Sequence, residues 1–296
     1  MARLAFLGTP DLAVPPLRAL VQAGHDLALV VTRADKRRGR GGATTPSPVK
    51  AAALDLGLPV TQELAEVPNA GVELGVVVAY GRIIPGSVLE QVPMLNLHFS
   101  LLPRWRGAAP LERAILAGDR ATGVCLMKID TGLDTGPVYA RRAVPIDDGT
   151  TLVELRVQLI EMGTNLLIEA LSGGVAGLPE PEAQVGEPTI AEKITAEDLH
   201  LEWGRPARSL LRVVHLGQAW TTFRGKRLTV LEAKVDNARD VAGEGLAPGE
   251  MVGAAVTTGQ GMVVLERVQP ESRSPMSAHD WLRGVRPRNG ERLGTD

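Results

Sequence analysis

The sequence predicts an α/β protein of two domains, with a mostly parallel sheet in the first domain and a small antiparallel β-barrel in the second. Three observations predict this organisation. Short apolar segments alternate with helix-like segments as far as residue 171. A stretch rich in Gly, Pro and Glu then covers residues 175–188, as in a linker. Beyond it lie several short β-prone segments separated by glycine turns. A chain of 296 residues is long enough for two ordinary domains.

The first half of the chain predicts buried strands over residues 4–7, 27–32, 76–79 and 95–98. Their almost continuous apolar character is expected of parallel strands that are covered on both faces. Gly8 ends the first strand, and Thr9 is expected to cap a helix with Pro10 at its first position and its end at Gly24. Strands that alternate with helices at these intervals indicate a Rossmann-like, mostly parallel sheet.

The pattern continues with helices predicted over residues 108–116 and 152–171 and strands over 123–129 and 138–145. After the linker-like stretch, a helix is expected over 205–214 and strands over 220–223, 228–234, 250–256 and 261–268. Short strands with glycine turns are typical of a barrel like the oligonucleotide-binding (OB) fold. We therefore expect a Rossmann-like domain over residues 1–185, a linker over 186–204 and an OB-like β-barrel over 205–296.

Composition excludes several kinds of protein. The net charge is −2, so any contact with nucleic acid depends on local basic patches. Cys125 is the only cysteine and lies in an apolar run, which excludes an internal disulfide and indicates a buried strand residue. The histidines are scattered without metal-ligand spacing, so we expect no metal. No secretory signal or membrane-spanning segment is evident, and we expect a monomeric cytoplasmic protein with no membrane partner.

The most informative residues are Asn96 and His98, at the end of the strand predicted over 95–98. Residues two apart on a strand point to the same face, so the amide and the imidazole can reach one spot. A lone histidine at a strand end is usually structural. Here the loop that follows places it at the edge of the sheet where α/β proteins bind ligands. An imidazole and an amide there can donate hydrogen bonds to a developing oxyanion.

A carboxylate, Asp134, follows in a second loop framed by Gly132 and Gly136. Taken alone it would be an aspartate of a turn. Beside His98 it can fix the protonation state of the imidazole and relay a proton through water. An amide, an imidazole and a carboxylate in one cleft are suited to acyl transfer without a covalent nucleophile. The sequence contains no Gly-x-Ser-x-Gly elbow, P-loop or dinucleotide fingerprint.

Basic residues are concentrated between Arg33 and Gly42, where five of the eight residues from Arg33 to Arg40 are cationic. A solvated charged loop is one interpretation. The loop also follows a predicted parallel strand on the side of the candidate site, where a glycine-rich cationic loop is suited to the phosphate backbone of RNA. Arg106 adds positive charge near the same candidate site. The second domain is locally basic too, either as a nucleic-acid platform or as ordinary surface arginine.

Together these residues resemble a known family. Asn96, His98, the Ser100-Leu101-Leu102-Pro103 loop and Asp134 match the core signature of formyltransferases that use 10-formyltetrahydrofolate. The longer match resembles the methionyl-tRNA formyltransferases within that family; its segments are Gly8-Thr9-Pro10-Asp11, Pro46-Ser47-Pro48-Val49-Lys50, Val78-Ala79-Tyr80-Gly81, 101–110, 132–136 and Pro275-Met276-Ser277-Ala278. Phe99 departs from the family pattern, which has a small residue there.

The resemblance implies that the methionyl amine of initiator Met-tRNA attacks the formyl carbon of the folate. Asn96 and His98 would then stabilise the oxyanion, and Asp134 would tune His98 and relay protons. The residues implied for the folate pocket are Tyr80, Gly81, Arg82, Ile83, Ser100, Leu101, Leu102, Pro103, Ile129, Asp130 and Leu133. The residues expected to contact tRNA are Arg37, Arg38, Arg40, Lys50 and Arg106.

Other acceptors and functions stay open at this point. A formyltransferase that acts on a sugar nucleotide or another small amine would keep Asn96, His98 and Asp134, but would have little use for the basic loop. A folate hydrolase or dehydrogenase fragment could share the same core. A third alternative is an RNA-binding protein that has lost its catalytic activity. RNA binding alone would not require Asn96, His98 and Asp134 together, so their presence argues against it.

Overall fold

The computed structural model describes residues 1–37, 44–236 and 246–295, so Arg38 and Arg40 lie outside the described residues. The chain divides into two compact units. The first comprises Met1–Leu111, Ala121–Pro145 and Arg156–Glu192, and the second comprises Glu112–Arg120, Ile146–Leu155 and Lys193–Asp296. The ranges 1–185, 186–204 and 205–296 for the domains and linker stay a prediction.

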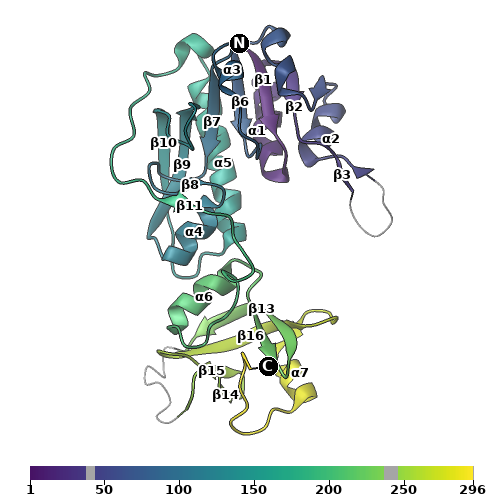
Figure 1. The fold of residues 1–296 in the computed structure, drawn as a ribbon, viewed down its shortest axis with the longest axis vertical. Helices are drawn as coiled ribbons and strands as arrows, with labels where there is room; N and C mark the ends of the chain where they lie inside the picture. Colours follow the sequence, from purple (N-terminus) through teal and green to yellow (C-terminus); the bar gives the residue numbers. More distant parts are fainter. Residues whose placement is uncertain (38–43, 237–245, 296) are drawn as a thin grey trace. The chain divides into compact units, whose positions relative to one another are not determined.

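The first unit is built on a seven-stranded sheet with the order β10-β9-β7-β6-β1-β2-β5 (Figure 1). The five strands from β7 to β5 are parallel, while β9 is antiparallel to β7 and β10 is antiparallel to β9. The predicted fold class is therefore confirmed for this half. The bounds are β1 (Arg3–Gly8), β2 (Asp26–Val31), β5 (Val60–Thr61), β6 (Leu74–Val78), β7 (Met94–His98), β9 (Ala121–Lys128) and β10 (Val138–Pro145).

The described residues up to 171 include five α-helices: α1 (Val14–Gln22), α2 (Pro48–Asp55), α3 (Gly86–Leu89), α4 (Pro110–Ala117) and α5 (Leu152–Ala170). The C-terminal part of α5 packs directly on β7. A Cβ atom at Gly163 would lie 2.9 Å from Cδ2 of Leu97, so the absence of a side chain there lets the helix approach the strand between Asn96 and His98. No helix in the described ranges is long and apolar enough to cross a membrane.

The expected helix cap at Thr9 is wrong. A 3₁₀ turn, Asp11–Ala13, precedes α1 without a side-chain cap, and the Thr9 hydroxyl donates to the backbone carbonyl of Tyr80 at 3.1 Å. This bond joins the loops that follow β1 and β6. The chain passes from β1 to β2 on one side and later returns to β6 on the other, so the strand order reverses here. Open α/β sheets bind ligands beyond the carboxyl ends of strands at such a point.

The second unit is an antiparallel sheet with the order β12-β13-β16-β15-β14, and β17 pairs with β16. Residues 250–256 were predicted as one strand, but β14 and β15 form a tight hairpin there because Gly253 adopts a positive φ of 64°. Helices α6 (Ala207–His215) and α7 (Ala278–Val285) complete the unit. The strand bounds are β12 (Trp220–Phe223), β13 (Lys226–Val235), β14 (Met251–Val252), β15 (Ala255–Thr257), β16 (Met262–Pro270) and β17 (Met276–Ser277).

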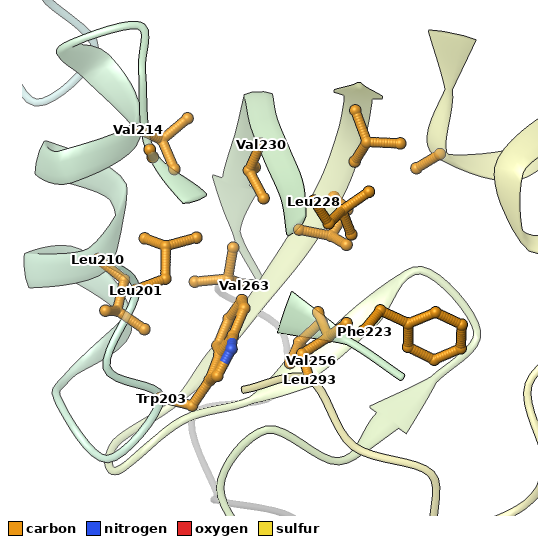
Figure 2. Close-up of a cluster of buried hydrophobic side chains, with 14 of the residues drawn as sticks. Leu201, Trp203, Leu210, Val214, Phe223, Leu228, Val230, Val256, Val263 and Leu293 are labelled. Atoms are coloured by element: carbon orange, nitrogen blue, oxygen red, sulfur yellow. The ribbon is translucent and has the colours of Figure 1, made fainter. Parts of the chain in front are cut away.

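Side chains from the helix and the strands meet in one core in this unit (Figure 2). Leu210 and Val214 of α6 face Val230 of β13 and Val263 of β16. Trp203 is 5% exposed, and its indole N–H donates to the hydroxyl of Thr221 at 3.0 Å. Trp203 is therefore a packing residue of this core.

The segment Glu291–Gly294 connects the two edges of this sheet. Beside β14, the Met251 N–H donates to the Glu291 carbonyl at 3.0 Å, and the Leu293 N–H donates to the Gly249 carbonyl at 2.8 Å. At the other edge, the Gly294 N–H donates to the Thr222 carbonyl of β12 at 2.9 Å. These bonds satisfy backbone groups that an open sheet would leave exposed, which is how a barrel removes its edges.

We expect Glu291→Gln to weaken the second unit in a pH-dependent way. Hydrogen bonds from Arg224, and then from the Arg288 backbone, hold the pKa of the Glu291 carboxyl at about 2. Because this pKa lies below its unfolded value, the carboxylate contributes stability above pH 4.5 that is lost as the pH falls towards 2. Urea unfolding should show the variant less stable than wild type at pH 7, with a difference that shrinks towards pH 2.

Glu232→Gln is the matched control, since Glu232 pairs with Arg267 at 3.3 Å with both side chains about half exposed. Exposed pairs of this kind contribute little, about 0–1 kcal/mol. Equal effects of the two substitutions at pH 7 would contradict the special role of Glu291.

Candidate active site

Strand β7 positions the amide and the imidazole of the site. It lies between parallel β6 and antiparallel β9, with Asn96 opposite Met127 and His98 opposite Cys125. His98 is buried, with 6% of its surface exposed. Because the strand is held on both sides, the shared face predicted for Asn96 and His98 is fixed by the sheet.

Asp134 brings the three polar residues together. Its Oδ1 accepts a long hydrogen bond from Nδ2 of Asn96 at 3.4 Å, and its Oδ2 lies 3.6 Å from Nδ1 of His98. The backbone N–H of Gly107 donates to Oδ2 at 2.8 Å. The side chain is only 17% exposed, and its backbone adopts the left-handed φ of 51°. The structure therefore gathers an amide, an imidazole and a carboxylate at one point.

The second ring nitrogen of His98 is also engaged. Nε2 lies 2.9 Å from the backbone carbonyl of Trp105. A carbonyl can only accept, so Nε2 carries the hydrogen in this bond and Nδ1 is the nitrogen that faces Asp134. Trp105 has a left-handed φ of 61°, and the guanidinium of Arg104 lies 4.5 Å from the centre of its ring.

The loop after β7 is shaped by its own polar contacts. The Ser100 hydroxyl is fully buried and donates to the Arg104 carbonyl at 2.6 Å. Leu102 is buried and is joined to Pro103 by a cis peptide bond. Phe99, the departure from the family pattern, is buried at 8% exposure. Phe99, Ser100 and Leu102 are therefore the buried part of the loop that carries Trp105 and Gly107.

The other residues expected at the folate pocket lie on the loops after β6 and β9. Tyr80 is buried, and its hydroxyl has no hydrogen-bond partner among the described residues. Burial raises the pKa of Tyr80. Ile83 and Leu133 are exposed apolar side chains, at 91% and 58%. Asp130 is used within its own loop, where Oδ1 accepts from the Gly132 N–H and the Thr135 hydroxyl.

Sequence reasoning missed the segment 182–191, which lies against both loops of the site. Ile190 and Ala191 form the short strand β11 (Ile190–Ala191), parallel to β8 (Arg106–Gly107). The Thr189 hydroxyl accepts from the Trp105 N–H at 2.8 Å. The Gln184 side chain contacts the Asp134 loop and Arg106. The only sequence signal was a Gln and a Thr in a Pro- and Glu-rich stretch, whose composition indicated a linker.

The residues expected to contact tRNA occupy different environments. Arg37 ends the short strand β3 (Lys36–Arg37), next to the residues outside the described ranges. The Lys50 ammonium is paired with Asp35 at 2.6 Å and stabilises the base of the same loop. Arg106 lies beside Asp134, where Nε and Nη2 donate to Oε1 of Gln184 at 3.1 and 2.7 Å. Of the described members, Arg106 is the one whose hydrogen-bond partner, Gln184, also contacts the Asp134 loop.

Two further possibilities for chemistry receive no support. In the part of the chain that the structure describes, no cluster of three or more His, Cys, Asp or Glu side chains could hold a metal ion. Cys125 is fully buried next to His98 on β9, and burial raises the pKa of its thiol. A protonated, inaccessible thiol is a packing residue rather than a nucleophile.

Comparison with known proteins shows the family to which the chain belongs. A family model described as formyl transferase matches residues 2–171, and one for the formyl transferase C-terminal domain matches residues 193–286. The chain belongs to the formyltransferase family. The methionyl-tRNA formyltransferase of Jannaschia sp. is 42% identical over 96% of this chain and 97% of its own length. That of Ruegeria pomeroyi is 41% identical over 98% of this chain and its entire length.

Solved structures share the formyltransferase fold at lower identity. Methionyl-tRNA formyltransferase from Clostridium thermocellum has a TM-score of 0.60 at 18% identity, over 80% of this chain and 95% of its own. An N-formyltransferase from Helicobacter canadensis, in complex with folinic acid and dTDP-3-aminofucose, has a TM-score of 0.68 at 16% identity, over 90% and 99%. These likenesses show the fold alone.

The geometry of the candidate site predicts a strong effect of Gly107→Ala. Gly107 has a φ of 116°, and a Cβ atom there would lie 2.9 Å from the Ala191 carbonyl oxygen. The substitution should cost about 2 kcal/mol or more of stability through backbone strain and this contact. It should also lower formyl transfer, because the N–H that orients Asp134 moves. Urea unfolding and a formyl-transfer assay measure the two effects.

Gly57→Ala is the control for this prediction. Gly57 also has a positive φ, 68°, but a Cβ atom there would meet nothing within 4 Å. It should cost only about 1 kcal/mol and leave formyl transfer unchanged. A Gly107→Ala enzyme with normal activity would show that Asp134 does not depend on this N–H.

Proposed function

We propose that this chain transfers the formyl group of 10-formyltetrahydrofolate to the methionyl amino group of initiator Met-tRNA, giving formylmethionyl-tRNA for translation initiation. The observation that carries the proposal is similarity over nearly the full length, at 40% identity and above, to methionyl-tRNA formyltransferases. The gathering of Asn96, His98 and Asp134 supports the chemistry. We also propose that the protein acts as a cytoplasmic monomer.

Two donors are available for the negative charge that develops on the formyl oxygen. The Asn96 amide presents Nδ2–H without a change of protonation. His98 has its Nε2–H committed to the Trp105 carbonyl, so the ring acts through Nδ1. As an imidazolium, His98 donates from Nδ1, and the Asp134 carboxylate 3.6 Å away stabilises the positive charge. Donors fixed in place before the reaction are the usual source of the largest catalytic effect.

Asp134 also provides a route for the proton of the attacking amine. Its carboxylate is held on Oδ2 by Gly107 N–H and on Oδ1 by the weaker contact with Asn96. A carboxylate in this position can accept this proton directly or through one water, and can return it to the folate nitrogen N10 as the bond from N10 to the formyl carbon breaks. The same carboxylate faces Nδ1 of His98. A proton taken up by Asp134 therefore removes the negative charge that stabilises the imidazolium.

The loops after β6 and β9 suit a folate. Bound 10-formyltetrahydrofolate supplies the formyl group. The exposed side chains of Ile83 and Leu133 provide apolar surface for aromatic rings, and the unpartnered Tyr80 hydroxyl is a buried polar atom that a ligand can satisfy. Gly81 and Arg82 lie between these residues on one loop. We propose that Ser100 and Leu102, with Leu101 and Pro103, shape the facing loop, while Ile129 and Asp130 support Leu133.

The acceptor side is proposed to use the basic residues. Arg106 is next to the catalytic carboxylate, so it suits the end of the tRNA that carries the methionyl group. Arg37 ends the short strand β3, and Lys50 lies in the first turn of α2. Arg38 and Arg40 lie outside the described residues. Contacts to phosphates from such residues fix the position of a nucleic acid and make its binding depend on salt.

Transfer of labelled formyl from 10-formyltetrahydrofolate tests the proposal, with charged initiator Met-tRNA, uncharged tRNA and a nucleotide-linked amino sugar as parallel acceptors. We expect label on charged Met-tRNA only. Label on the sugar alone would keep the Asn96–His98–Asp134 chemistry and overturn the acceptor. Label on none of the three would overturn the function.

His98→Ala and Asp134→Asn should each lower kcat by about 100-fold or more, given usual oxyanion and acid–base contributions. His98→Ala removes the donor, and Asp134→Asn removes the charge that stabilises the imidazolium. His279→Ala and Asp55→Asn are controls, since their side chains are 78% and 72% exposed. Steady-state kinetics with charged Met-tRNA measure the effect, and turnover near that of the controls would remove the residue from the mechanism.

A further inference from the structure

The side chain of Gln184 makes four hydrogen bonds at the centre of the site. Its Nε2 donates to the backbone carbonyls of Asp134 and Gly136, both at 2.8 Å. Its Oε1 accepts from Nε and Nη2 of Arg106 at 3.1 and 2.7 Å. We propose that Gln184 is a positioning residue that holds Asp134 towards His98 and, with its other end, orients Arg106 for the acceptor. The inference rests on the proposed function.

The Asp134 loop needs an external support. Asp134 adopts a left-handed φ of 51°, which costs a non-glycine residue free energy unless the surroundings fix it. The next turn is tight, since a Cβ atom at Gly136 would lie 1.9 Å from the Lys128 carbonyl oxygen. Gln184 bonds the carbonyls on both sides of residue 135, so it fixes the orientation of the peptide units that aim the carboxylate.

The primary amide is the group that fits this position. Its NH₂ has two hydrogens, one for each carbonyl, and its oxygen has two lone pairs, one for each nitrogen of Arg106. A carboxylate of the same length would still accept from Arg106, and more strongly. It could not donate to either carbonyl. Gln184→Glu therefore breaks the contact with the Asp134 loop and keeps the contact with Arg106.

Arg106 is held by the other end of the Gln184 side chain. The guanidinium uses Nε and Nη2 for Gln184, which sets its plane and leaves Nη1 outside this contact. The N–H of the next residue, Gly107, donates to Asp134. One side chain thus ties the carboxylate used in chemistry to the guanidinium proposed to bind the acceptor. Loss of either contact should affect a different kinetic constant.

The experiment compares Gln184→Glu and Gln184→Met with wild type in formyl transfer to charged initiator Met-tRNA. In Gln184→Glu we expect kcat to fall by about 10- to 100-fold, because small displacements of a catalytic group have effects of this size, with KM for Met-tRNA nearly unchanged. In Gln184→Met, which loses both contacts, KM should rise as well. Gln91→Glu is the matched control, since Nε2 of Gln91 also donates to a backbone carbonyl, that of Ser87 at 2.7 Å, on the surface.

Hydrogen exchange of the Gly107 amide gives a readout that does not depend on the substrate. This N–H is protected by Asp134, so it should exchange faster in Gln184→Glu than in wild type or Gln91→Glu. Wild-type kcat together with wild-type exchange in Gln184→Glu would overturn the inference, and so would a change in KM alone. An inactive wild-type enzyme would instead count against the proposed function, while the exchange measurement would still decide the role of Gln184.

Discussion

A largely buried carboxylate is costly unless donors surround it, and Asp134 sets this requirement for the whole site. Its side chain is 17% exposed, and its two oxygens meet one backbone N–H, one amide and one imidazole from two other segments. A charge-assisted hydrogen bond such as that from Gly107 is stronger than a neutral one. Strand β7, which carries Asn96, and the loops that carry Gly107 and Asp134 must therefore be fixed relative to one another before any substrate binds.

The sheet and the segment 182–191 satisfy this requirement in different ways. Strand β7 is held by β6 and β9, so Asn96 and His98 are positioned by the core of the unit. Gly107 and Asp134 lie on loops that have no such support from the sheet. The pairing of β11 with β8 holds the first loop, and Gln184 holds the second. A segment with the composition of a linker thus has a structural role in the active site.

The sequence was informative where local periodicity decides the structure. Apolar runs predicted β1, β2, β6 and β7, and the two-residue period of a strand placed Asn96 and His98 on one face. Helix α2 could also have been predicted, because Ser47 caps it and Pro48 is its first residue. Gln184 and Thr9 could not, since their partners are backbone carbonyls tens of residues away that become neighbours only after folding. The hairpin of β14 and β15 was missed because a single glycine, Gly253, reverses an otherwise apolar run.

The two nitrogens of His98 divide the site into a structural side and a chemical side. Nε2 donates to the backbone carbonyl of Trp105, and the N–H of Trp105 in turn donates to the Thr189 hydroxyl. The ring plane and the position of its hydrogen are therefore set by the backbone of a loop. Nδ1, the Asn96 amide and both oxygens of Asp134 lie on the other side. In the proposed mechanism Nδ1 donates to the oxyanion from the imidazolium form of the ring, and the Asp134 carboxylate lies 3.6 Å from this nitrogen. The contacts that fix the separation of His98 and Asp134 are therefore expected to affect the rate.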